Sequence, residues 1–390
     1  MYDFNKIIDR KQSYSKKWRK YAGKDILPLW VADMDFTAPP AVLAALQRTL
    51  EHGIFGYSMH QEEVRRDIVD YLQREYNWGV VEKDIIWLPG LVCGLNLASQ
   101  ALSDVDQPII TATPVYPPFM SAPLNAGREL LKTPLLEVNG DWRWNWEDLE
   151  KQLAAARIKP KLLLLCNPHN PVGKMWTREE LEQLLEFVIR HDLVVCSDEI
   201  HCDLVLDENR KHIPFASISK EAAERSITLM APSKTYNVAG LNCSFAIATN
   251  PLIRNKFAKI MRGLFGDLNS FGVAACQAAY NECEDWKNAL LVYLRANRDL
   301  IVQTLAPYPD LQLTIPEATY LLWIDGRKLC AKYNIENLQQ FFEQAGVGLS
   351  DGAEFDLPGF VRLNFGTSRV TLTQALERMV TALNQLKEQG

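Results

Sequence analysis

Residues 227–240 of the chain read ITLMAPSKTYNVAG, an apolar run that ends in a lysine among small and polar residues. Two earlier apolar runs end in the same way. Residues 193–196 lead into Ser-Asp-Glu-Ile-His at 197–201, and residues 161–166 lead into Asn-Pro-His-Asn-Pro-Val-Gly at 167–173. In α/β proteins, ligands bind at the carboxyl ends of buried strands, where polar residues follow each strand. The three runs therefore predict one site at the carboxyl edge of an α/β sheet.

Strand-like and helical segments alternate through most of the chain. Such alternation predicts an α/β fold with a doubly wound, mainly parallel sheet. We assign it to a large domain over residues 46–285. Helical patterns such as 179–191 separate some of the strand-like segments, which lie at 107–112, 161–166, 193–197, 226–230 and 244–249.

The rest of the chain predicts a smaller α+β domain. We expect this domain over residues 286–390, and we expect the N-terminal segment, 1–45, to join it. Its pattern consists of a long helix, two strands and a closing amphipathic helix, at 286–305, 319–324, 360–365 and 372–386.

Three tryptophans, Trp142, Trp144 and Trp146, alternate with other residues. This period of two is typical of one face of a strand or hairpin. Because aromatic stripes usually pack in a core, we expect packing rather than ligand binding from them.

The composition excludes several classes of protein. Of 390 residues, 47% are hydrophobic and 23% charged, as in ordinary globular proteins. A net charge of −6 offers no basic surface for nucleic acid. The eight cysteines form no Cys-x-x-Cys pair, so we expect neither a disulfide framework nor a metal site. No signal-peptide pattern and no apolar run near the roughly 20 residues of a membrane span is visible, which predicts a cytoplasmic protein without a membrane partner.

Lys234, Asp198 and His201 each have an ordinary interpretation as well as a functional one. Lys234 is either a solvated surface lysine, the usual case, or a covalent cofactor anchor. An anchor must be neutral to act as a nucleophile, so burial and nearby positive charge have to lower its pKa. Asp198 alone fits a strand-end or capping carboxylate, and His201 alone fits a core histidine. Their combination carries more information than any one of them.

In combination, the motifs Asn-Pro-x-Gly at 170–173, Asp-Glu-x-His at 198–201 and Ser-Lys at 233–234 resemble those of the fold-type-I pyridoxal-phosphate enzymes, the aspartate aminotransferase superfamily. The resemblance extends from about residue 27 to the C-terminal helix. Within this superfamily, the sequence is most similar to the cystathionine β-lyase/cystalysin branch. The similar segments are residues 28–36, 197–201, 231–235 and 361–365.

The resemblance implies pyridoxal 5'-phosphate as the cofactor, held by residues 46–285. Lys234 would form a Schiff base with its aldehyde and later take the Cα proton of the substrate. Asp198 would pair with the ring nitrogen and keep it protonated, which makes the ring an electron sink. Asn170 would donate to the phenolic oxygen, and His201 would lie near it, where many family members have tyrosine.

The resemblance also implies contacts to the ring face and the phosphate. Tyr116 would stack on the ring and tune its catalytic state; ordinary core packing is the alternative. Leu91, Val92 and Cys93 precede or begin a predicted helix, whose N-terminus favours anions. They would bind the phosphate mainly through backbone groups, together with Ser233. A turn before a helix is the ordinary interpretation of the same stretch.

Four further positions complete the implied site. Asn242 stands where aminotransferases often carry a phosphate-binding arginine, and the cystalysin-like branch lacks that arginine too. Tyr57 matches a tyrosine that reaches across the dimer interface, so the resemblance implies a symmetric homodimer. Arg362 would bind the substrate carboxylate through two parallel hydrogen bonds, with a backbone contact from Ala32.

The implied activity is that of a carbon–sulfur β-lyase acting on L-cystathionine or related L-cysteine S-conjugates. The products would be a thiol, pyruvate and ammonia. An aminotransferase is the alternative, because both reactions share the removal of the Cα proton and no residue decides between them. A third hypothesis is a lyase that also binds a regulatory protein. The fold fills the 390 residues, which leaves no room for a DNA-binding domain.

Overall fold

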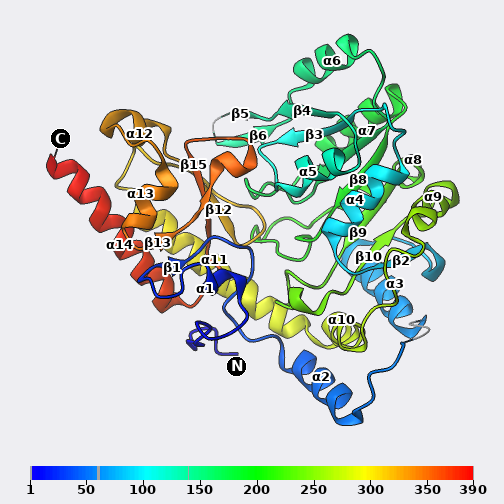
Figure 1. The fold of residues 1–390 in the computed structure, drawn as a ribbon, viewed down its shortest axis with the longest axis horizontal. Helices are drawn as coiled ribbons and strands as arrows, with labels where there is room; N and C mark the ends of the chain where they lie inside the picture. The colour runs from blue at the N-terminus through cyan, green and yellow to red at the C-terminus, as the bar shows by residue number, and fades with distance from the viewer. Residues whose placement is uncertain (1, 59–61, 139, 390) are drawn as a thin grey trace.

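The computed structural model describes residues 2–58, 62–138 and 140–389 (Figure 1). Within these residues, seven strands form the central sheet in the order β2-β10-β9-β8-β7-β3-β4. All neighbouring strands are parallel except β10, which is antiparallel to β2 and β9. The predicted α/β fold with a mainly parallel sheet is confirmed. The strands are β2 (Ile85–Leu88), β3 (Ile109–Thr113), β4 (Leu130–Pro134), β7 (Leu162–Cys166), β8 (Val194–Asp198), β9 (Ser226–Met230) and β10 (Ser244–Ile247).

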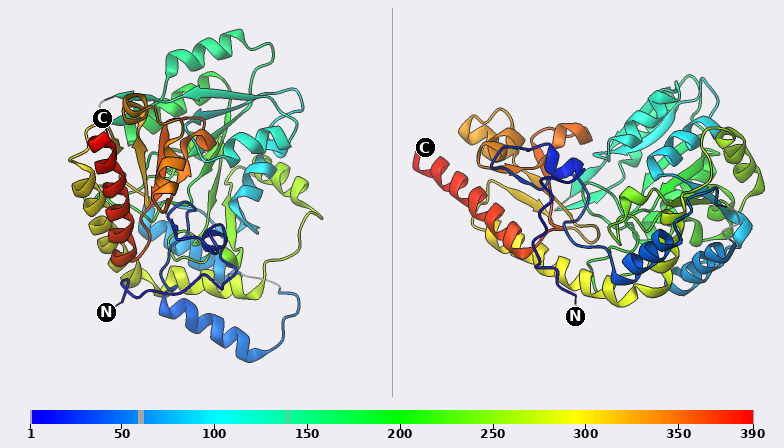
Figure 2. Two further views of the ribbon diagram at one scale, coloured as in Figure 1. Left: turned by 60° about the vertical axis from the view of Figure 1, so that its left-hand side comes forward. Right: turned by 60° about the horizontal axis from the view of Figure 1, so that its bottom comes forward.

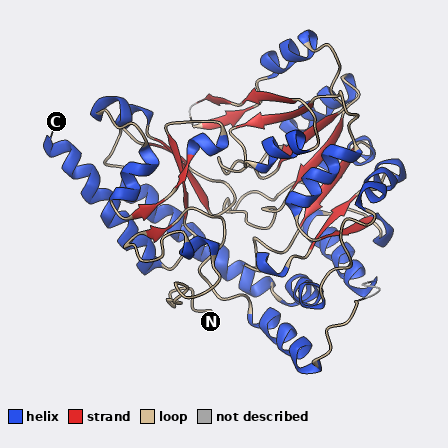
Figure 3. Ribbon diagram, viewed as in Figure 1, coloured by secondary structure: helices blue, strands red, loops and turns tan. Residues whose placement is uncertain are grey.

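Helices cover both faces of this sheet, as Figure 3 shows. Strands β7 and β9 are buried along their whole length, which explains why they read as continuous apolar runs. Helices α4, α5 and α9 share one apolar cluster with one face, and α6 and α7 share another with the opposite face. These helices are α4 (Leu91–Ala101), α5 (Pro118–Asn125), α6 (Trp146–Ala155), α7 (Arg178–Arg190), α8 (Lys220–Glu224) and α9 (Pro251–Met261).

The C-terminal part forms a second, antiparallel sheet in the order β11-β12-β15-β14. Strand β1 pairs in parallel with β13, so the N-terminal segment lies against this part of the chain. The domain boundaries at 45 and 285 remain a prediction. The elements are β1 (Leu27–Pro28), β11 (Gln312–Thr314), β12 (Leu321–Asp325), β13 (Val347–Gly348), β14 (Ser350–Asp351), β15 (Phe360–Asn364), α12 (Arg327–Tyr333), α13 (Leu338–Gln344) and α14 (Arg369–Gln389).

The long helix α11 (Glu284–Leu305) packs against α14 at one end and α10 at the other (Figure 2). The remaining helices are α1 (Lys16–Arg19), α2 (Pro40–His52), α3 (Glu62–Tyr76) and α10 (Ser270–Glu282). Helix α2 packs on α10 at the periphery of the molecule (Figure 1). Among the described residues, no helix is both long and apolar enough to cross a bilayer.

The three tryptophans agree only in part with the expectation that they share one face of a strand or hairpin. Trp142 lies in β6 (Asp141–Arg143), which forms a hairpin with β5 (Leu136–Val138). Trp146 instead begins α6, because the side chain of Asn145 caps that helix by accepting from the backbone N–H of Asp148. Trp142 and Trp144 are buried in the apolar core, in agreement with the predicted packing role.

Candidate active site

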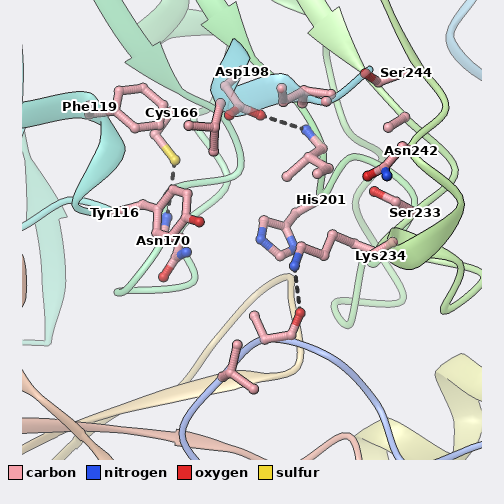
Figure 4. Close-up of a pocket in the computed structure, with 18 of the residues that line it drawn as sticks. Tyr116, Phe119, Cys166, Asn170, Asp198, His201, Ser233, Lys234, Asn242 and Ser244 are labelled. Atoms are coloured by element: carbon pink, nitrogen blue, oxygen red, sulfur yellow. Dashed lines mark hydrogen bonds between the residues drawn. The ribbon is translucent and has the colours of Figure 1, made fainter. Parts of the chain in front are cut away.

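A cavity of about 220 Å³ lies where the loops that follow β7, β8 and β9 meet strand β15 (Figure 4). Because the parallel strands end at one edge of the sheet, residues distant in the sequence converge there. Most of the residues that the sequence predicted line this cavity, namely Ala32, Leu91, Val92, Tyr116, Asn170, Asp198, His201, Ser233, Lys234 and Arg362.

Lys234 follows strand β9 and points its amine into the cavity (Figure 4). Nζ donates a hydrogen bond to the backbone carbonyl of Ala32 at 2.5 Å. Burial, opposed by Asp33 and Asp198 and assisted by Arg362, lowers the pKa of Lys234 to about 8. A substantial fraction of the amine is therefore neutral near pH 8, as a nucleophile or base requires.

Asp198 ends strand β8 and is buried, with 6% of its surface exposed. One carboxylate oxygen accepts the backbone N–H of Ile200 at 3.1 Å. Within the described part of the chain, no positively charged side chain hydrogen-bonds to this carboxylate. Burial raises the pKa of Asp198 to about 7, and the neighbouring Glu199 raises it too. A buried carboxylate without a positively charged partner is stabilised when a cationic group binds to it.

Arg362 lies on β15 and is also buried. Nη1 donates to Oδ1 of Asn170 at 2.9 Å, and Nη2 donates to the carbonyl of Trp30 at 2.9 Å and to Oγ of Ser350 at 3.3 Å. Nε has no hydrogen-bond partner among the described residues. Burial lowers the pKa of Arg362 to about 10, so the guanidinium remains a cation at neutral pH. It retains a free donor for an anionic ligand.

Tyr116 and His201 also line the cavity. The backbone N–H of Tyr116 donates to the carbonyl of Asn170 at 3.0 Å, which joins the loops after β3 and β7. His201 is buried, and its Nδ1 has no partner among the described residues. Burial, followed by the charges of Lys234 and Arg362, holds the pKa of His201 well below its usual value. Its imidazole is therefore neutral at physiological pH.

The N-terminus of helix α4 opens onto the cavity through Gly90, Leu91 and Val92. Gly90 provides no side-chain cap, so the first N–H groups of the helix are available to a ligand. Unpaired N–H groups and the helix dipole together favour an anion. Ser233 lines the cavity as well.

Two predicted residues lie outside the cavity. The side chain of Cys93 is half-buried and packs with the apolar cluster of α4, because successive helix positions point in different directions. Cys93 could therefore contact a ligand in the cavity only through its backbone. Tyr57 lies in the loop after α2 and is fully exposed, at 103%. It does not line the cavity of its own chain.

Several residues that line the cavity or lie beside it were not predicted as site residues from the sequence. Cys166 ends β7, and its sulfur accepts the backbone N–H of Asn170 at 3.4 Å. Tyr320 lies just before β12, and its hydroxyl donates to the carbonyl of Ala32 at 3.1 Å. The position of Cys166 at the end of an apolar run was a usable signal, whereas Tyr320 had none. The cavity is completed by Val31, Pro89, Gly90, Phe119, Ile200, Ala231, Ala239, Asn242, Cys243 and Ser244.

Comparisons with known proteins agree with this geometry. The model of the family "Aminotransferase class I and II" matches residues 24–379. Cystathionine beta-lyase PatB of Bacillus subtilis (strain 168) is 38% identical over 390 residues, which cover 98% of this chain and 100% of the relative. The crystal structure of OvoB is 44% identical, with a TM-score of 0.93 over 98% of this chain and 99% of that one.

The crystal structure of cystalysin from Treponema denticola, which contains a pyridoxal 5'-phosphate cofactor, is also similar. It is 32% identical, with a TM-score of 0.93, and the match covers 99% of this chain and 100% of cystalysin. The resemblance to the cystathionine β-lyase/cystalysin branch is thereby confirmed. The chain belongs to the aminotransferase class I and II family.

Proposed function

We propose that the protein is a pyridoxal-phosphate-dependent carbon–sulfur β-lyase. It cleaves L-cystathionine or a related L-cysteine S-conjugate into a thiol, pyruvate and ammonia. The observation that carries the proposal is the convergence of Lys234, Asp198 and Arg362 on one cavity. Relatives named cystathionine beta-lyase and neighbours named C-S lyase favour this reaction over amino transfer.

The residues present fit pyridoxal 5'-phosphate. The buried carboxylate of Asp198, without a cationic partner among the described residues, suits a protonated ring nitrogen. The uncapped N-terminus of α4 suits the phosphate, and Tyr116 offers an aromatic face. Lys234 would hold the cofactor covalently, with Asn170 and His201 near the phenolic oxygen. When bound, the cofactor supplies an electron sink for the charge that develops on the substrate Cα.

Arg362 would bind the α-carboxylate of the amino-acid substrate. Its free Nε is a ready donor, and the bonds to Asn170 and Trp30 fix the plane of the guanidinium. With Nε free, a planar fork would match a carboxylate through two parallel hydrogen bonds if one Nη exchanged its present acceptor for the ligand. The backbone of Ala32, at the edge of the same cavity, would add a contact. Arg362 would thus orient the Cα–H bond in relation to Lys234.

Lys234 would then accept the Cα proton. A base with a pKa of about 8 is well matched to neutral or mildly alkaline pH. Tyr116, Phe119 and Ile200 line the cavity with apolar surface, which would strengthen the local electrostatic interactions. Loss of the thiolate from Cβ completes the elimination, whereas an aminotransferase returns the proton to the cofactor.

We extend the proposal to a homodimer in which Tyr57 reaches the cavity of the partner. Tyr57 is exposed beside Ile54 and Phe55, which are exposed by 72% and 58%. Apolar side chains in such a cluster favour burial against another protein surface. A second copy would supply Tyr57 as a phosphate ligand where Asn242 replaces an arginine. A cytoplasmic location remains part of the proposal.

Turnover without a keto acid tests the proposed reaction. Purified protein reconstituted with pyridoxal 5'-phosphate is mixed with L-cystathionine, and pyruvate is followed by coupling to lactate dehydrogenase. Continuous pyruvate formation supports the lyase. A product that accumulates only when a keto acid is added supports the aminotransferase instead. Lys234→Ala is the matched control, because it lacks the amine that both reactions need.

A further inference from the structure

The backbone carbonyl of Ala32 accepts hydrogen bonds from two side chains of different parts of the fold. Nζ of Lys234 donates to it at 2.5 Å, a bond drawn in Figure 4. The hydroxyl of Tyr320 donates to the same oxygen at 3.1 Å. A carbonyl has two lone pairs, so these two donors saturate it. Tyr320 therefore shares its acceptor with the residue proposed to anchor the cofactor.

Tyr320 is rigidly placed. Only 1% of its surface is exposed, and its backbone carbonyl accepts the N–H of Phe365 at 2.9 Å. Its ring meets the ring of His201 edge-on, with centroids 6.2 Å apart. Burial raises the pKa of the Tyr320 hydroxyl, so it keeps its proton and remains a donor throughout the physiological range.

The segment 31–36 that carries this carbonyl is fixed on both sides of it. Nδ2 of Asn364 donates to the carbonyls of Val31 and Asp33 at 2.6 and 2.7 Å. Asn237, three residues after Lys234, exchanges two hydrogen bonds with the backbone of Met34, at 3.0 and 3.1 Å. The Ala32 carbonyl lies between these anchors. Apart from Lys234, Tyr320 is its side-chain partner within the described chain.

We propose that Tyr320 is a positioning residue whose hydroxyl fixes the Ala32 carbonyl as the resting point for the free amine of Lys234. The inference rests on the proposed function, because the amine is free only before the cofactor binds and after the substrate has replaced it. The hydrogen bond from Tyr320 occupies one lone pair of the carbonyl oxygen. Lys234 therefore donates to the other lone pair of an oxygen that is a weaker acceptor than a free carbonyl. The amine then stays near the substrate Cα without being held as an ammonium ion.

Removal of the Tyr320 hydroxyl should shift the equilibrium between the neutral amine and the ammonium form of Lys234 in one direction. In Tyr320→Phe the carbonyl offers its full electron density to Lys234, which favours the ammonium form and raises its pKa. The other groups that face Lys234 are unchanged: Asp33 and Asp198 raise its pKa, and burial and Arg362 lower it. His201 contributes no charge, because its imidazole is neutral.

The first experiment measures how fast the cofactor-free full chain takes up pyridoxal 5'-phosphate at each pH. Uptake requires neutral Lys234, so the midpoint of the pH profile reports its pKa. We expect Tyr320→Phe to move this midpoint upward by about half a pH unit to one unit. Tyr308→Phe is the matched control: it removes a buried hydroxyl bonded to Oδ1 of Asn384 at 2.8 Å, outside the cavity. Its profile should equal that of the wild type.

The second experiment uses the reconstituted enzyme and a substrate deuterated at Cα. At a pH below about 8, Tyr320→Phe should lower kcat by about three- to tenfold, change KM less than about twofold, and increase the isotope effect on kcat. A purely structural role would lower the melting temperature without affecting the isotope effect. Unchanged pH profile and isotope effect in Tyr320→Phe would overturn the inference.

A second variant of the same chain tests the inference if Tyr320→Phe folds poorly. It carries 3-fluorotyrosine at position 320 alone, which retains the hydroxyl and makes it a stronger donor. The uptake profile should then move to lower pH, and an unmoved profile contradicts the inference. If the wild type takes up no cofactor or forms no pyruvate, the proposed function fails instead, so the two failures are distinguishable.

Discussion

Nη1 of Arg362 donates to Oδ1 of Asn170 across 2.9 Å, and this bond joins the C-terminal antiparallel sheet to the loop that follows β7. The two residues are 192 positions apart in the chain. The site is thus built at the meeting of the two sheets, with the guanidinium that we propose to bind substrate on one and the residues that we propose to bind the cofactor on the other. Changes at this junction should affect substrate binding more than the fold.

Arg362→Lys should raise KM for L-cystathionine by on the order of 100-fold with a smaller effect on kcat. Lysine is a point charge that cannot reproduce the two parallel hydrogen bonds to a carboxylate. Steady-state kinetics of pyruvate formation check this. Arg327→Lys is a suitable control, because Arg327 grips Asp325 in a similar way outside the cavity. Equal effects of the two substitutions would refute the role of Arg362.

Asp198→Asn should lower kcat by on the order of 100-fold or more, because an amide cannot hold a proton on the ring nitrogen. The absorbance spectrum should show that the cofactor still binds through Lys234. Asp84→Asn, which removes a buried carboxylate bonded to Arg254, is the control for general damage. Full activity in Asp198→Asn would exclude the proposed pairing with the ring.

The same substitution should stabilise the cofactor-free chain at neutral pH. The folded-state pKa of Asp198 is raised from 3.8 to about 7, so the folded state binds more protons than the unfolded state between these values. Stability linked to Asp198 is present below about pH 4 and is lost as the pH rises through 7. The loss amounts to about 4 kcal/mol. Urea unfolding of wild type and Asp198→Asn at pH 5 and 8 should show a gap that widens with pH; a constant gap would be inconsistent with this account.

Uptake of the cofactor by the wild type should accelerate with rising pH and level off above about pH 8. The reason is that Lys234, with its lowered pKa of about 8, must lose a proton before it attacks the aldehyde. Stopped-flow absorbance measures the rate. A profile that still rises at pH 10 would indicate an ordinary, solvated lysine.

The N-terminal segment should contribute strongly to stability through Asp35. This carboxylate accepts hydrogen bonds from Arg10 and Lys17 at 2.8 Å and from Trp18 at 2.9 Å. Lys17 is fully buried, so Asp35→Asn leaves its charge poorly compensated and should cost about 3 kcal/mol. Urea unfolding measures this change.

The surface pair of Asp25 and Arg378 provides the control for the Asp35 prediction. Asp25 is 90% exposed, so Asp25→Asn should cost less than about 1 kcal/mol. If the two substitutions were equally mild, the segment that carries Ala32 would not depend on the buried pair.

The sequence predicted the parts of the fold that depend on local pattern. Strands β7, β8 and β9 are apolar because both faces are buried, and their polar ends were visible as motifs. Edge strand β4 was missed because it is partly exposed and ends in Pro134. The period-two pattern wrongly extends the predicted strand or hairpin to Trp146, because Asn145 caps a helix that begins at this residue.

Contacts between distant segments could not be predicted from the residues alone. No sequence motif singles out Tyr320 or Asn237, and both act through hydrogen bonds to the segment that contains Ala32. Tyr320 lies 288 positions from its partner Ala32, and Asn237 lies 203 positions from its partner Met34. Tyr57 does not line the cavity of its own chain, so its proposed role depends on a second copy. Such contacts depend on tertiary packing and on assembly, and the periodicity of hydrophobic residues along the sequence does not predict them.

The most direct test of the central claim is the stoichiometry of L-cystathionine turnover by the reconstituted protein, with no keto acid present. Homocysteine, pyruvate and ammonia are measured together, relative to the amount of Lys234 that borohydride reduction labels with cofactor. A β-lyase should form many equivalents of all three products, in equal amounts, per labelled Lys234. At most one equivalent of keto acid per site, with the amino group retained on the cofactor, would contradict it.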